Sequence, residues 1–459
     1  MNNNHRVLIV GGGLAGLGAA HALRKRGLNC TVLEASPRAG GRIMTEDVNG
    51  FRIDAGANIF LEAYGAVMEM AEELGVSVIP TPTPIVGGTY FGRKLHGFYG
   101  QHSLKSRFKT AKTLLSFQFL SPKGVWQALR FVRMLKAQES HFSFDDHSPM
   151  LDIDTEESAA EFVESNLGTE LLERFVQPVL SGYTLGYPEE VGAAHAMAAF
   201  WHFGLKGVVW PRMPERGVGA LADALAQACH ENTRLSTPVE RIVLEGGFVR
   251  GAIISGGDFV EADAVICATT ASTALRITPG LPHAMTEALD GVTYSKCCRV
   301  VFGLDSSPLP RGWYGVAFPR QLGGLVSGMS NSAVLLPTSA PEGKALIHAF
   351  VIGEKAEGLF ALSDEEIADR VIAEAREYFP AIPSQLLFSR VYRWKEAVCL
   401  APGGMMRAMS ELRRQSLSSL RGLFFAGEYM GGVPSTNGAL RSGIIAAEDC
   451  FEILQGSIT

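Results

Sequence analysis

The first 34 residues contain the pattern that most limits how this chain can fold. Residues 6–10 form a short apolar run, with the length and composition of a buried parallel strand. Residues 11–16 follow at once and satisfy G-x-G-x-x-G, and a segment suited to a helix packed on a sheet comes next. A second apolar run, residues 30–33, ends at Glu34. Strand, glycine loop, helix, strand and acid in this order predict a dinucleotide-binding βαβ unit.

Each part of this unit has a physical role towards a dinucleotide. Gly11 permits the tight turn, Gly13 lets a pyrophosphate approach the backbone, and Gly16 allows close packing of the helix on the strand. The free N–H groups and the positive dipole end of the helix, which begins near Leu14, attract the phosphates. Glu34 is placed to accept hydrogen bonds from the ribose hydroxyls.

Composition excludes several other classes of protein. The chain of 459 residues is about three times the length of a typical single domain, and 47% of its residues are hydrophobic, which is too apolar for a disordered chain. No run of 18 apolar residues is present, so no spanning helix is predicted. The net charge of −6 argues against nucleic acid as a partner. Seven cysteines without a CxxC pair favour a reduced interior, and the sequence therefore predicts a cytoplasmic protein.

Two further motifs indicate which dinucleotide is bound. Residues 38–42 read R-x-G-G-R, and residues 54–58 read Asp-Ala-Gly-Ala-Asn. Near the C-terminus, an apolar run ends in Ala-Gly-Glu at residues 426–428, and a turn rich in small residues leads into a predicted helix over 437–454. With these motifs the sequence resembles the FAD-dependent amine oxidase superfamily, which includes flavin-containing amine oxidases, protoporphyrinogen oxidases and carotenoid-type desaturases.

The resemblance implies FAD as the cofactor, and the absence of a cysteine beside the C-terminal motif implies that FAD is held non-covalently. It places FAD contacts at Gly11, Gly13, Leu14, Ala15, Gly16, Glu34, Ala35, Gly41, Arg42, Gly56, Ala57, Asn58, Val239, Ala268, Trp394, Gly427, Glu428, Ser435, Thr436, Asn437 and Ala439. It also implies an α/β fold with a Rossmann-like FAD-binding domain assembled from residues 1–80, 215–275 and 420–459. An α+β substrate domain, with a mixed sheet and a helical subdomain, would be inserted into it.

The two insertions differ in their sequence patterns. Residues 81–214 are predicted to be the helical part, in which Asp154-x-x-Glu157 is a candidate capping box. Residues 276–419 are predicted to be the sheet-rich part, interrupted by a helix at about 364–378. A second G-x-G-x-x-A pattern at 217–222 is interpreted as a loop into a helix, because prolines argue against a strand immediately before it.

Charge is distributed unevenly over the first insertion. Residues 74–138 contain no Asp or Glu, whereas ten Lys or Arg occur over 93–136 among aromatic and aliphatic residues. Residues 139–164 then hold nine acids and no Lys or Arg. Two interpretations stay open: two oppositely charged faces of a helical domain, or peripheral contact with acidic lipids at the inner face of the membrane.

The chemistry expected from these residues is flavin-dependent oxidation. No Ser–His–Asp set, metal cluster or carboxylate pair is visible, and a bound flavin needs mainly positioning from the protein. Lys296 is the candidate catalytic residue, since it resembles the lysine that amine oxidases hold near flavin N5; the alternative is a surface lysine entering a strand.

The predicted activity is removal of hydride from a CH–CH or CH–NH bond of a hydrophobic small molecule. The enzyme would resemble protoporphyrinogen oxidases or desaturases, with O2 or a quinone as electron acceptor. Two alternatives remain open: an amine oxidase, and a non-enzymatic binder of prenylated proteins. Residues 435–437 lack the aromatic residue typical of amine oxidases, and the C-terminal motif also lacks the G-[IL]-x-D-C pattern of protoporphyrinogen oxidases.

Overall fold

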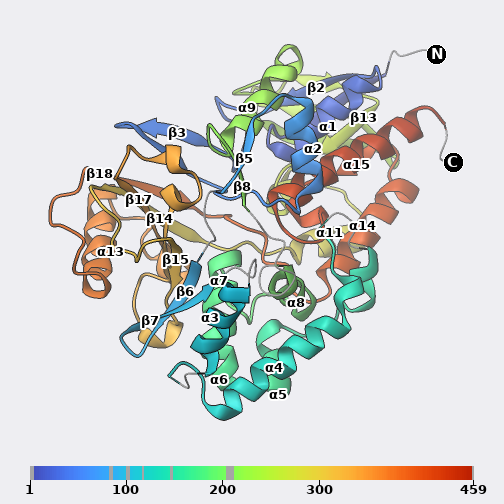
Figure 1. Cartoon of the computed structure of the whole chain (residues 1–459). Coiled ribbons are helices and arrows are strands. Elements are labelled where there is room, and N and C mark those ends of the chain that lie inside the picture. Colours follow the sequence, from blue (N-terminus) through green and yellow to red (C-terminus); the bar gives the residue numbers. More distant parts are fainter. Residues whose placement is uncertain are drawn as a thin grey trace.

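The computed structural model of the chain describes residues 5–81, 86–99, 104–115, 118–144, 148–202 and 211–456. Three regions are arranged around a common centre (Figure 1): a parallel sheet with its helices, a larger mixed sheet, and a helical layer. The predicted α/β class, with a parallel sheet and an additional mixed sheet, is confirmed.

A five-stranded parallel sheet is assembled from segments far apart in the sequence. Its strand order is β19, β13, β1, β2, β9, and every neighbouring pair is parallel. All of β13 and four of the five residues of β1 are buried, which suits a parallel sheet covered on both faces. The bounds are β1 Arg6–Val10, β2 Asn29–Leu33, β9 Thr233–Arg234, β13 Ala264–Cys267 and β19 Leu423–Phe425.

Helices cover both faces of this sheet. On one face, α1 (Leu14–Lys25) and α15 (Thr436–Leu454) lie side by side, so the two ends of the chain meet (Figure 1). A Cβ on Gly443 would lie 2.0 Å from the carbonyl oxygen of Ala15, so these helices approach too closely for a larger residue there. The other face is covered by α10 (Ala271–Ile277), α11 (His283–Asp290) and α14 (Met405–Ser419).

Smaller elements complete this region. An antiparallel sheet contains β10 (Val239–Glu245), β11 (Phe248–Ile254) and β12 (Phe259–Glu261). Two antiparallel strand pairs are also present: β3 (Thr45–Val48) with β4 (Phe51–Asp54), which follow one another in the chain, and β5 (Val78–Pro80) with β8 (Arg212–Pro214), which are far apart in the sequence. The remaining helices are α2 (Gly65–Glu73) and α9 (Gly219–Ala228).

A seven-stranded sheet forms the second region, in the order β18, β14, β17, β16, β15, β6, β7. Its pairs are antiparallel except β15 with β6. Alternate residues of β14 and β17 pack under α13 (Asp364–Tyr378), and the intervening residues face the centre of the molecule. The bounds are β6 Val86–Phe91, β7 Lys94–Tyr99, β14 Cys297–Leu304, β15 Trp313–Ala317, β16 Gly328–Asn331, β17 Ala345–Ile352 and β18 Phe388–Trp394; the short α12 spans Gly353–Glu357.

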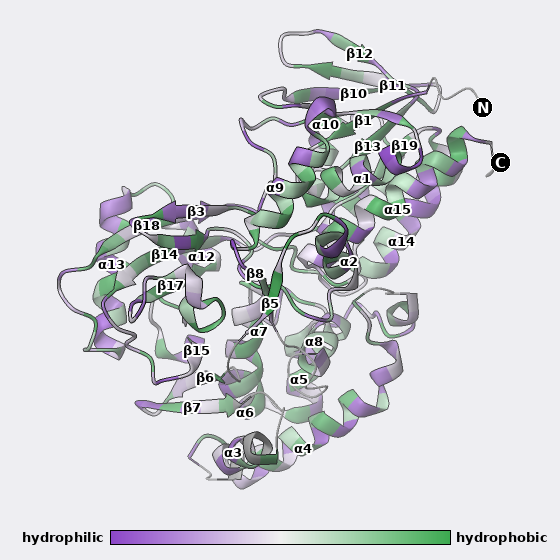
Figure 2. Cartoon of the chain, turned by 45° about the horizontal axis from the view of Figure 1, so that its top comes forward, coloured by the Kyte–Doolittle hydropathy of each residue, from purple (hydrophilic) through white to green (hydrophobic). Residues whose placement is uncertain are grey.

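The helical layer lies on the far side of the molecule from the parallel sheet (Figure 2). It contains α3 (Leu104–Leu115), α4 (Pro122–Ala137), α5 (Ala159–Leu167), α6 (Thr169–Leu171), α7 (Gln177–Thr184) and α8 (Ala193–Phe200), with a π-helical turn at Leu172–Val176. Within the described ranges, no helix is both long enough and apolar enough to cross a bilayer.

Two local predictions are wrong. The capping box is formed by Ser158 and Glu161 at the start of α5, whereas Asp154 accepts hydrogen bonds from the N–H groups of Gly404 and Arg407 at the start of α14. The segment 81–214, predicted to be mostly helical, contains α3 to α8 and also contributes β6 and β7 to the seven-stranded sheet.

Prolines also do not prevent a strand before the second glycine pattern. β8 forms there and pairs with β5 over three residues. Because this sheet has only two short strands, few main-chain N–H groups have to donate across it, and the prolines are tolerated. The pattern itself leads into α9, as predicted, although Trp210 lies outside the described residues.

Candidate functional site

A cavity of about 1560 Å³ lies where the three regions meet. Val10, Leu33 and Ala268, at the carboxyl ends of β1, β2 and β13, form one end of it. Residues of the seven-stranded sheet and of α4, α7 and α8 line the rest. In open parallel sheets, ligands bind in the crevice outside the carboxyl ends of the strands. The cavity exceeds the usual volume of a small-molecule pocket, about 300–1,000 Å³, so it has room for more than one small molecule.

The glycine loop between β1 and α1 leaves backbone N–H groups facing this cavity. Gly11 has φ +105°, a conformation that favours glycine, and a Cβ on Gly16 would lie 1.9 Å from the Gly11 carbonyl oxygen. No side chain caps the N-terminus of α1. Because Gly13, Leu14 and Ala15 line the cavity, the free N–H groups and the helix dipole form a site for an anion such as a pyrophosphate.

Glu34 stands at the end of β2 and is held in position by the loop. Its Oε2 accepts a hydrogen bond from the Gly12 N–H at 2.5 Å, and its Oε1 accepts one from the Ser36 N–H at 2.8 Å. Ala35 and Val239 line the cavity beside it. The carboxylate is therefore oriented beside the glycine loop, where a ribose would donate hydrogen bonds to it.

Arg42 and Glu428 join the two sequence motifs from opposite ends of the chain. Arg42 Nη1 lies 2.5 Å from Glu428 Oε1, which also accepts a hydrogen bond from the Cys399 N–H at 3.0 Å. Burial lowers the pKa of Arg42, and the neighbouring Glu428 carboxylate outweighs this effect, so the pKa is raised overall. Both side chains line the cavity as a charged pair whose remaining hydrogen-bonding capacity is available to a ligand.

The start of α15 forms another part of the wall. Ser435 caps the helix by accepting a hydrogen bond from the Gly438 N–H at 3.0 Å. The hydroxyl of Thr436 is buried, has no hydrogen-bond partner among the described residues, and belongs to a residue that lines the cavity. A buried polar atom without a partner indicates that a ligand supplies one.

The segment 54–58 contributes Gly56, Ala57 and Asn58 to the wall of the cavity. Trp394 donates from Nε1 to the Ala55 carbonyl oxygen at 3.0 Å, and Arg299 donates from Nη1 to the Asp54 carbonyl oxygen at 2.8 Å. A Cβ on Gly56 would lie only 1.8 Å from the Arg42 carbonyl oxygen. Two side chains of the mixed sheet thus hold this loop against the cavity.

These features fit FAD in size and in chemistry. A glycine cradle at the start of α1, the Glu34 carboxylate beside it, a charged pair and the start of α15 all line the cavity, and together they offer partners for the pyrophosphate, the adenosine ribose and the flavin end of FAD. The following predicted residues line the cavity: Gly11, Gly13, Leu14, Ala15, Glu34, Ala35, Gly41, Arg42, Gly56, Ala57, Asn58, Val239, Ala268, Trp394, Gly427, Glu428, Ser435, Thr436 and Ala439.

Three predicted site residues lie elsewhere. Gly16 packs against the glycine loop, and Asn437 is buried, with Oδ1 accepting from the Val67 N–H and Nδ2 donating to the Phe144 carbonyl oxygen. Lys296 precedes β14, pairs with Glu357 at 2.6 Å and does not line the cavity. Arg299, three residues further on, lines it instead, because side chains alternate between the two faces of a strand.

The part of the cavity away from the glycine loop is apolar. Its walls come from the helical layer and the seven-stranded sheet, and no Asp or Glu among the described residues lines this part. The sequence motifs did not identify this apolar part of the cavity. One signal for it was present, because a charged residue, Arg299, interrupts the apolar run 297–304. The principal lining residues are Phe98, Phe131, Val132, Leu135, Phe175, Val179, Phe200, Arg299, Tyr314, Val316, Met329, Phe350 and Ile352.

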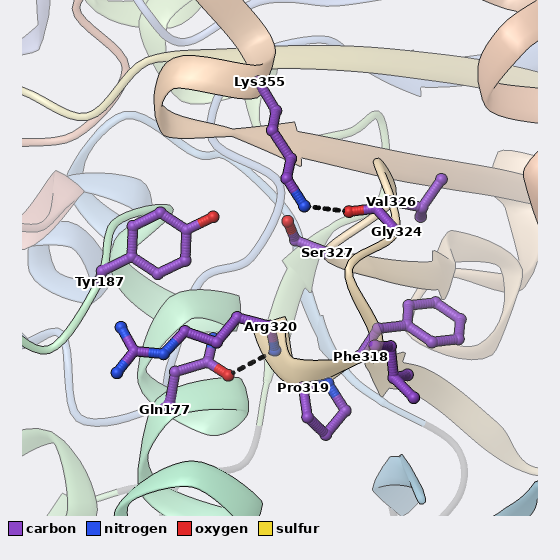
Figure 3. A pocket seen from close by; sticks show the side chains of 10 residues that line it. Gln177, Tyr187, Phe318, Pro319, Arg320, Gly324, Val326, Ser327 and Lys355 are labelled. Carbon is purple, nitrogen blue, oxygen red and sulfur yellow. Dashed lines mark hydrogen bonds between the residues drawn. The ribbon is translucent and has the colours of Figure 1, made fainter.

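A much smaller pocket, of about 10 Å³, lies where the helical layer meets the mixed sheet (Figure 3). It shares Ser327 with the large cavity. The main-chain N–H of Arg320 donates to Gln177 Oε1 at 2.9 Å, and its guanidinium bonds both Glu173 and Glu189. Lys355 Nζ donates to the carbonyl oxygens of Gly323 and Gly324. Because both charged lining residues have partners within the protein, this pocket is interpreted as a structural contact between the helical layer and the mixed sheet.

Comparison with known proteins agrees with this geometry. The family model of flavin-containing amine oxidoreductases matches residues 14–451, nearly the whole chain. The chain belongs to this family. It is an FAD-dependent oxidoreductase, as predicted from the motifs at its two ends.

Its relatives cover both of the activities considered from the sequence. The coproporphyrinogen III oxidase of Bacillus subtilis is 25% identical over 93% of this chain and 94% of its own. The chloroplastic/mitochondrial protoporphyrinogen oxidase 2 of Arabidopsis thaliana is 22% identical over 98% of this chain and 94% of its own length. Among solved structures, the cyclohexylamine oxidase of Brevibacterium oxydans superposes with a TM-score of 0.75 at 20% identity, covering 98% of this chain and 99% of that one. This last similarity shows the fold alone.

Proposed function

We propose that the protein oxidises a large, hydrophobic, cyclic molecule of the porphyrinogen class by removing hydride to FAD. The observation that carries this proposal is the apolar half of the cavity, which adjoins the FAD cradle and has no acidic lining residue among those described. Such a compartment accommodates an uncharged ring system and excludes water. The names of the two curated relatives, a coproporphyrinogen III and a protoporphyrinogen oxidase, support the same substrate class.

We assign the cofactor contacts as follows. The loop at Gly11 and Gly13, with the start of α1, would hold the pyrophosphate, and Glu34 would bind the adenosine ribose. Arg42 and Glu428 would contact the middle of the cofactor, and the start of α15 would face the pyrimidine edge of the flavin. No cysteine among the described residues lines the cavity, so FAD is held without a covalent bond.

Bound FAD supplies the hydride acceptor, and the chain's own residues supply position and a dry environment. Trp394 and Arg299 hold the loop 54–58 that would lie beside the flavin. Lys296 forms an ion pair outside the cavity, so we propose no step in which it transfers a proton.

An amine substrate is the second candidate, favoured by the fold shared with cyclohexylamine oxidase. An ammonium group would be repelled by the buried guanidinium of Arg299 and would find no carboxylate in the apolar half of the cavity. The same half therefore favours a porphyrinogen over an amine.

Anaerobic reduction of the purified, flavin-loaded protein tests this proposal. Coproporphyrinogen III or protoporphyrinogen should bleach the flavin absorbance, whereas cyclohexylamine and putrescine should not. Bleaching by an amine alone would assign the second function instead. Reoxidation of the bleached protein by air, compared with a soluble quinone, then identifies the electron acceptor.

We further infer that α3 and α4 contact an anionic membrane surface at the inner face of the bilayer. Their outer sides expose Leu104 (85%), Phe108 (71%), Trp126 (57%) and Leu129 (55%) among lysines and arginines. The opposite side of α4 lines the cavity through Phe131 and Leu135, so a lipophilic substrate would have a short path from the lipid. Other parts of the basic stretch, such as Phe117, lie outside the described residues.

Flotation with liposomes tests the membrane contact. Wild-type protein should float with vesicles that contain anionic lipid, and Trp126→Asp should reduce the floating fraction. Phe259→Asp provides a matched control, because Phe259 is similarly exposed (52%) but lies on β12, in the sheet region far from α4. Absence of flotation at any salt concentration would contradict the inference.

A further inference from the structure

Arg299 is a buried cation in a predominantly apolar strand. It occupies the third position of β14, and its side chain is on the face that looks towards the cavity, not on the face covered by α13. The residue is only 4% exposed and is among those that line the cavity. A guanidinium stays protonated at ordinary pH, so this strand carries a full positive charge at the cavity wall.

Among the described residues, Arg299 has no acidic partner. Its one hydrogen bond runs from Nη1 to the carbonyl oxygen of Asp54, and its buried Nε has no hydrogen-bond partner. The carboxylate of Asp54 is engaged elsewhere, because Oδ1 accepts from the Thr45 hydroxyl at 2.6 Å and from the Val218 N–H at 3.0 Å. The ring of Phe350, 4.9 Å from the guanidinium carbon, provides the remaining contact.

Burying a charge without a partner of opposite charge costs free energy, so a buried Arg299 without an ion pair requires an explanation. Burial lowers the pKa of Arg299 more than its acidic neighbours, among them the Asp54 carboxylate, raise it. His348 on the same face is fully buried, and burial followed by the charge of Arg299 holds its pKa well below the ordinary value. The neutral imidazole therefore adds no countercharge. Buried charges in proteins are normally paired, and an anion from a ligand would pair this one.

Glycines lie further along the same wall of the cavity. Gly328 on β16 is opposite Phe350, and Gly315 on β15 pairs with Gly87 on β6. All three glycines line the cavity, and a Cβ on Gly87, four strands away from β14, would meet nothing within 4 Å. Tyr314 lines the cavity as well. The cation therefore lies on the wall of a largely apolar compartment that has open volume further along the same sheet.

We propose that Arg299 binds a carboxylate of the substrate and thereby orients the hydrophobic ring system against the flavin. The proposal rests on the proposed function and narrows its substrate class to apolar molecules that carry at least one carboxylate. A guanidinium binds a carboxylate through two parallel N–H···O hydrogen bonds, which sets orientation as well as affinity. Such a contact would select one edge of a ring that apolar packing alone could not distinguish.

Binding of acid and ester pairs tests the proposal. The probes are coproporphyrin III with its tetramethyl ester, and pyrenebutyrate with its methyl ester, each titrated into oxidised, flavin-loaded protein and followed by fluorescence anisotropy. We expect wild-type protein to prefer each acid, and Arg299→Met to weaken acid binding by about 10- to 100-fold with little change for the esters. Arg299→Gln keeps a polar side chain and should also lose the preference for the acid over its ester. This variant replaces Arg299→Met in the test if Arg299→Met does not fold.

Arg390→Met is the matched control, because Arg390 pairs with Val301 on the same sheet but is exposed and does not line the cavity. It should bind acids as wild type does. An acid preference that survives in both Arg299 variants would overturn the proposal. So would a changed reduction potential of the flavin with unchanged acid preference, since the cation would then act on the cofactor.

The outcome is separable from that of the porphyrinogen assay. If porphyrinogens bleach the flavin and Arg299→Met retains the acid preference, the proposed function stands and the carboxylate site does not. If no porphyrinogen bleaches the flavin but the preference for pyrenebutyrate is lost in Arg299→Met, the carboxylate site stands and a different acid is the substrate.

Discussion

Replacing Arg320 with methionine should weaken the joint between the helical layer and the mixed sheet. Its guanidinium bonds two carboxylates of the helical layer, with Nε 3.0 Å from Glu173 Oε2 and Nη1 2.9 Å from Glu189 Oε2 (Figure 3 shows Arg320 itself). The side chain of Glu173 is 11% exposed, that of Arg320 is 30% exposed, and that of Glu189 is 49% exposed. Methionine retains an unbranched apolar stem of similar shape but has no guanidinium, so Glu173 stays nearly buried without its cationic partner.

The size of the effect follows from this burial. Removing one partner of a buried ion pair costs about 3–5 kcal/mol, and partial exposure of Arg320 reduces the expectation here to about 2–3 kcal/mol. An unfolding entropy of about 2.1 cal/mol/K per residue gives about 1 kcal/mol/K for a chain of 459 residues. The melting temperature should therefore fall by about 2–3 °C.

The loss should depend on pH. Burial raises the pKa of Glu189, but the hydrogen bonds from Arg320 outweigh burial and leave that pKa below its ordinary value. A lowered carboxyl pKa stabilises the folded state above the unfolded pKa, about 4.3 for Glu, and this stabilisation is lost as the pH falls. Because R320M loses this stabilisation, the difference in melting temperature should be largest near neutral pH and smaller at about pH 4.5.

Thermal unfolding of flavin-saturated wild-type and R320M protein at both pH values measures this difference. Equal excess FAD is needed in every sample, because bound cofactor raises the melting temperature. E189Q is the control, and loss of this more exposed partner should cost less than about 1 kcal/mol. A melting temperature of R320M equal to that of wild type, or a deficit as large in acid as at neutral pH, would refute the reasoning.

Three further predictions concern the cofactor cradle and its support. Gly16→Val should prevent flavin retention, because a Cβ there would lie 1.9 Å from the Gly11 carbonyl oxygen; a normal ratio of flavin to protein absorbance would contradict this. Arg42→Met should weaken FAD binding by about 10- to 100-fold, measured by flavin fluorescence, and more than Glu428→Gln, which still accepts a hydrogen bond; equal effects would contradict the prediction. Burial raises the pKa of Asp54 to about 6, which costs stability above the unfolded pKa of about 3.9. Asp54→Asn should therefore become more stable relative to wild type as the pH rises from about 4 to about 7. A difference in melting temperature between the two proteins that stays the same over this pH range would contradict the prediction.

Prediction from sequence succeeded where neighbouring residues define a structure together. The glycine loop, Glu34 and the start of α15 line one cavity, since a βαβ unit and a strand–turn–helix are local, and their contacts with FAD stay a prediction. Asn437 lies within the same motif yet points into the protein, because helical residues one position apart face different directions.

The positions that the sequence patterns could not settle share a physical cause. Lys296 and Arg299 are three positions apart at the start of one strand, and only the register of β14 in the sheet decides which cation faces the cavity. Asp154 was expected to cap the nearest helix but caps α14, some 250 positions along the chain. A carboxylate can accept hydrogen bonds from any helix start that packs near it, and the sequence does not state which one does.

The sequence by itself therefore determined the dinucleotide half of the molecule: the parallel sheet, the FAD cradle and membership of the flavin family. The apolar half was decided by tertiary structure alone, because its wall combines single side chains from β14, β15, β17, α4 and α7. A glycine loop binds through its backbone, so its residues can be recognised in order along the chain. A substrate compartment binds through side chains whose directions depend on strand register and helix packing, and these exist only once the chain has folded.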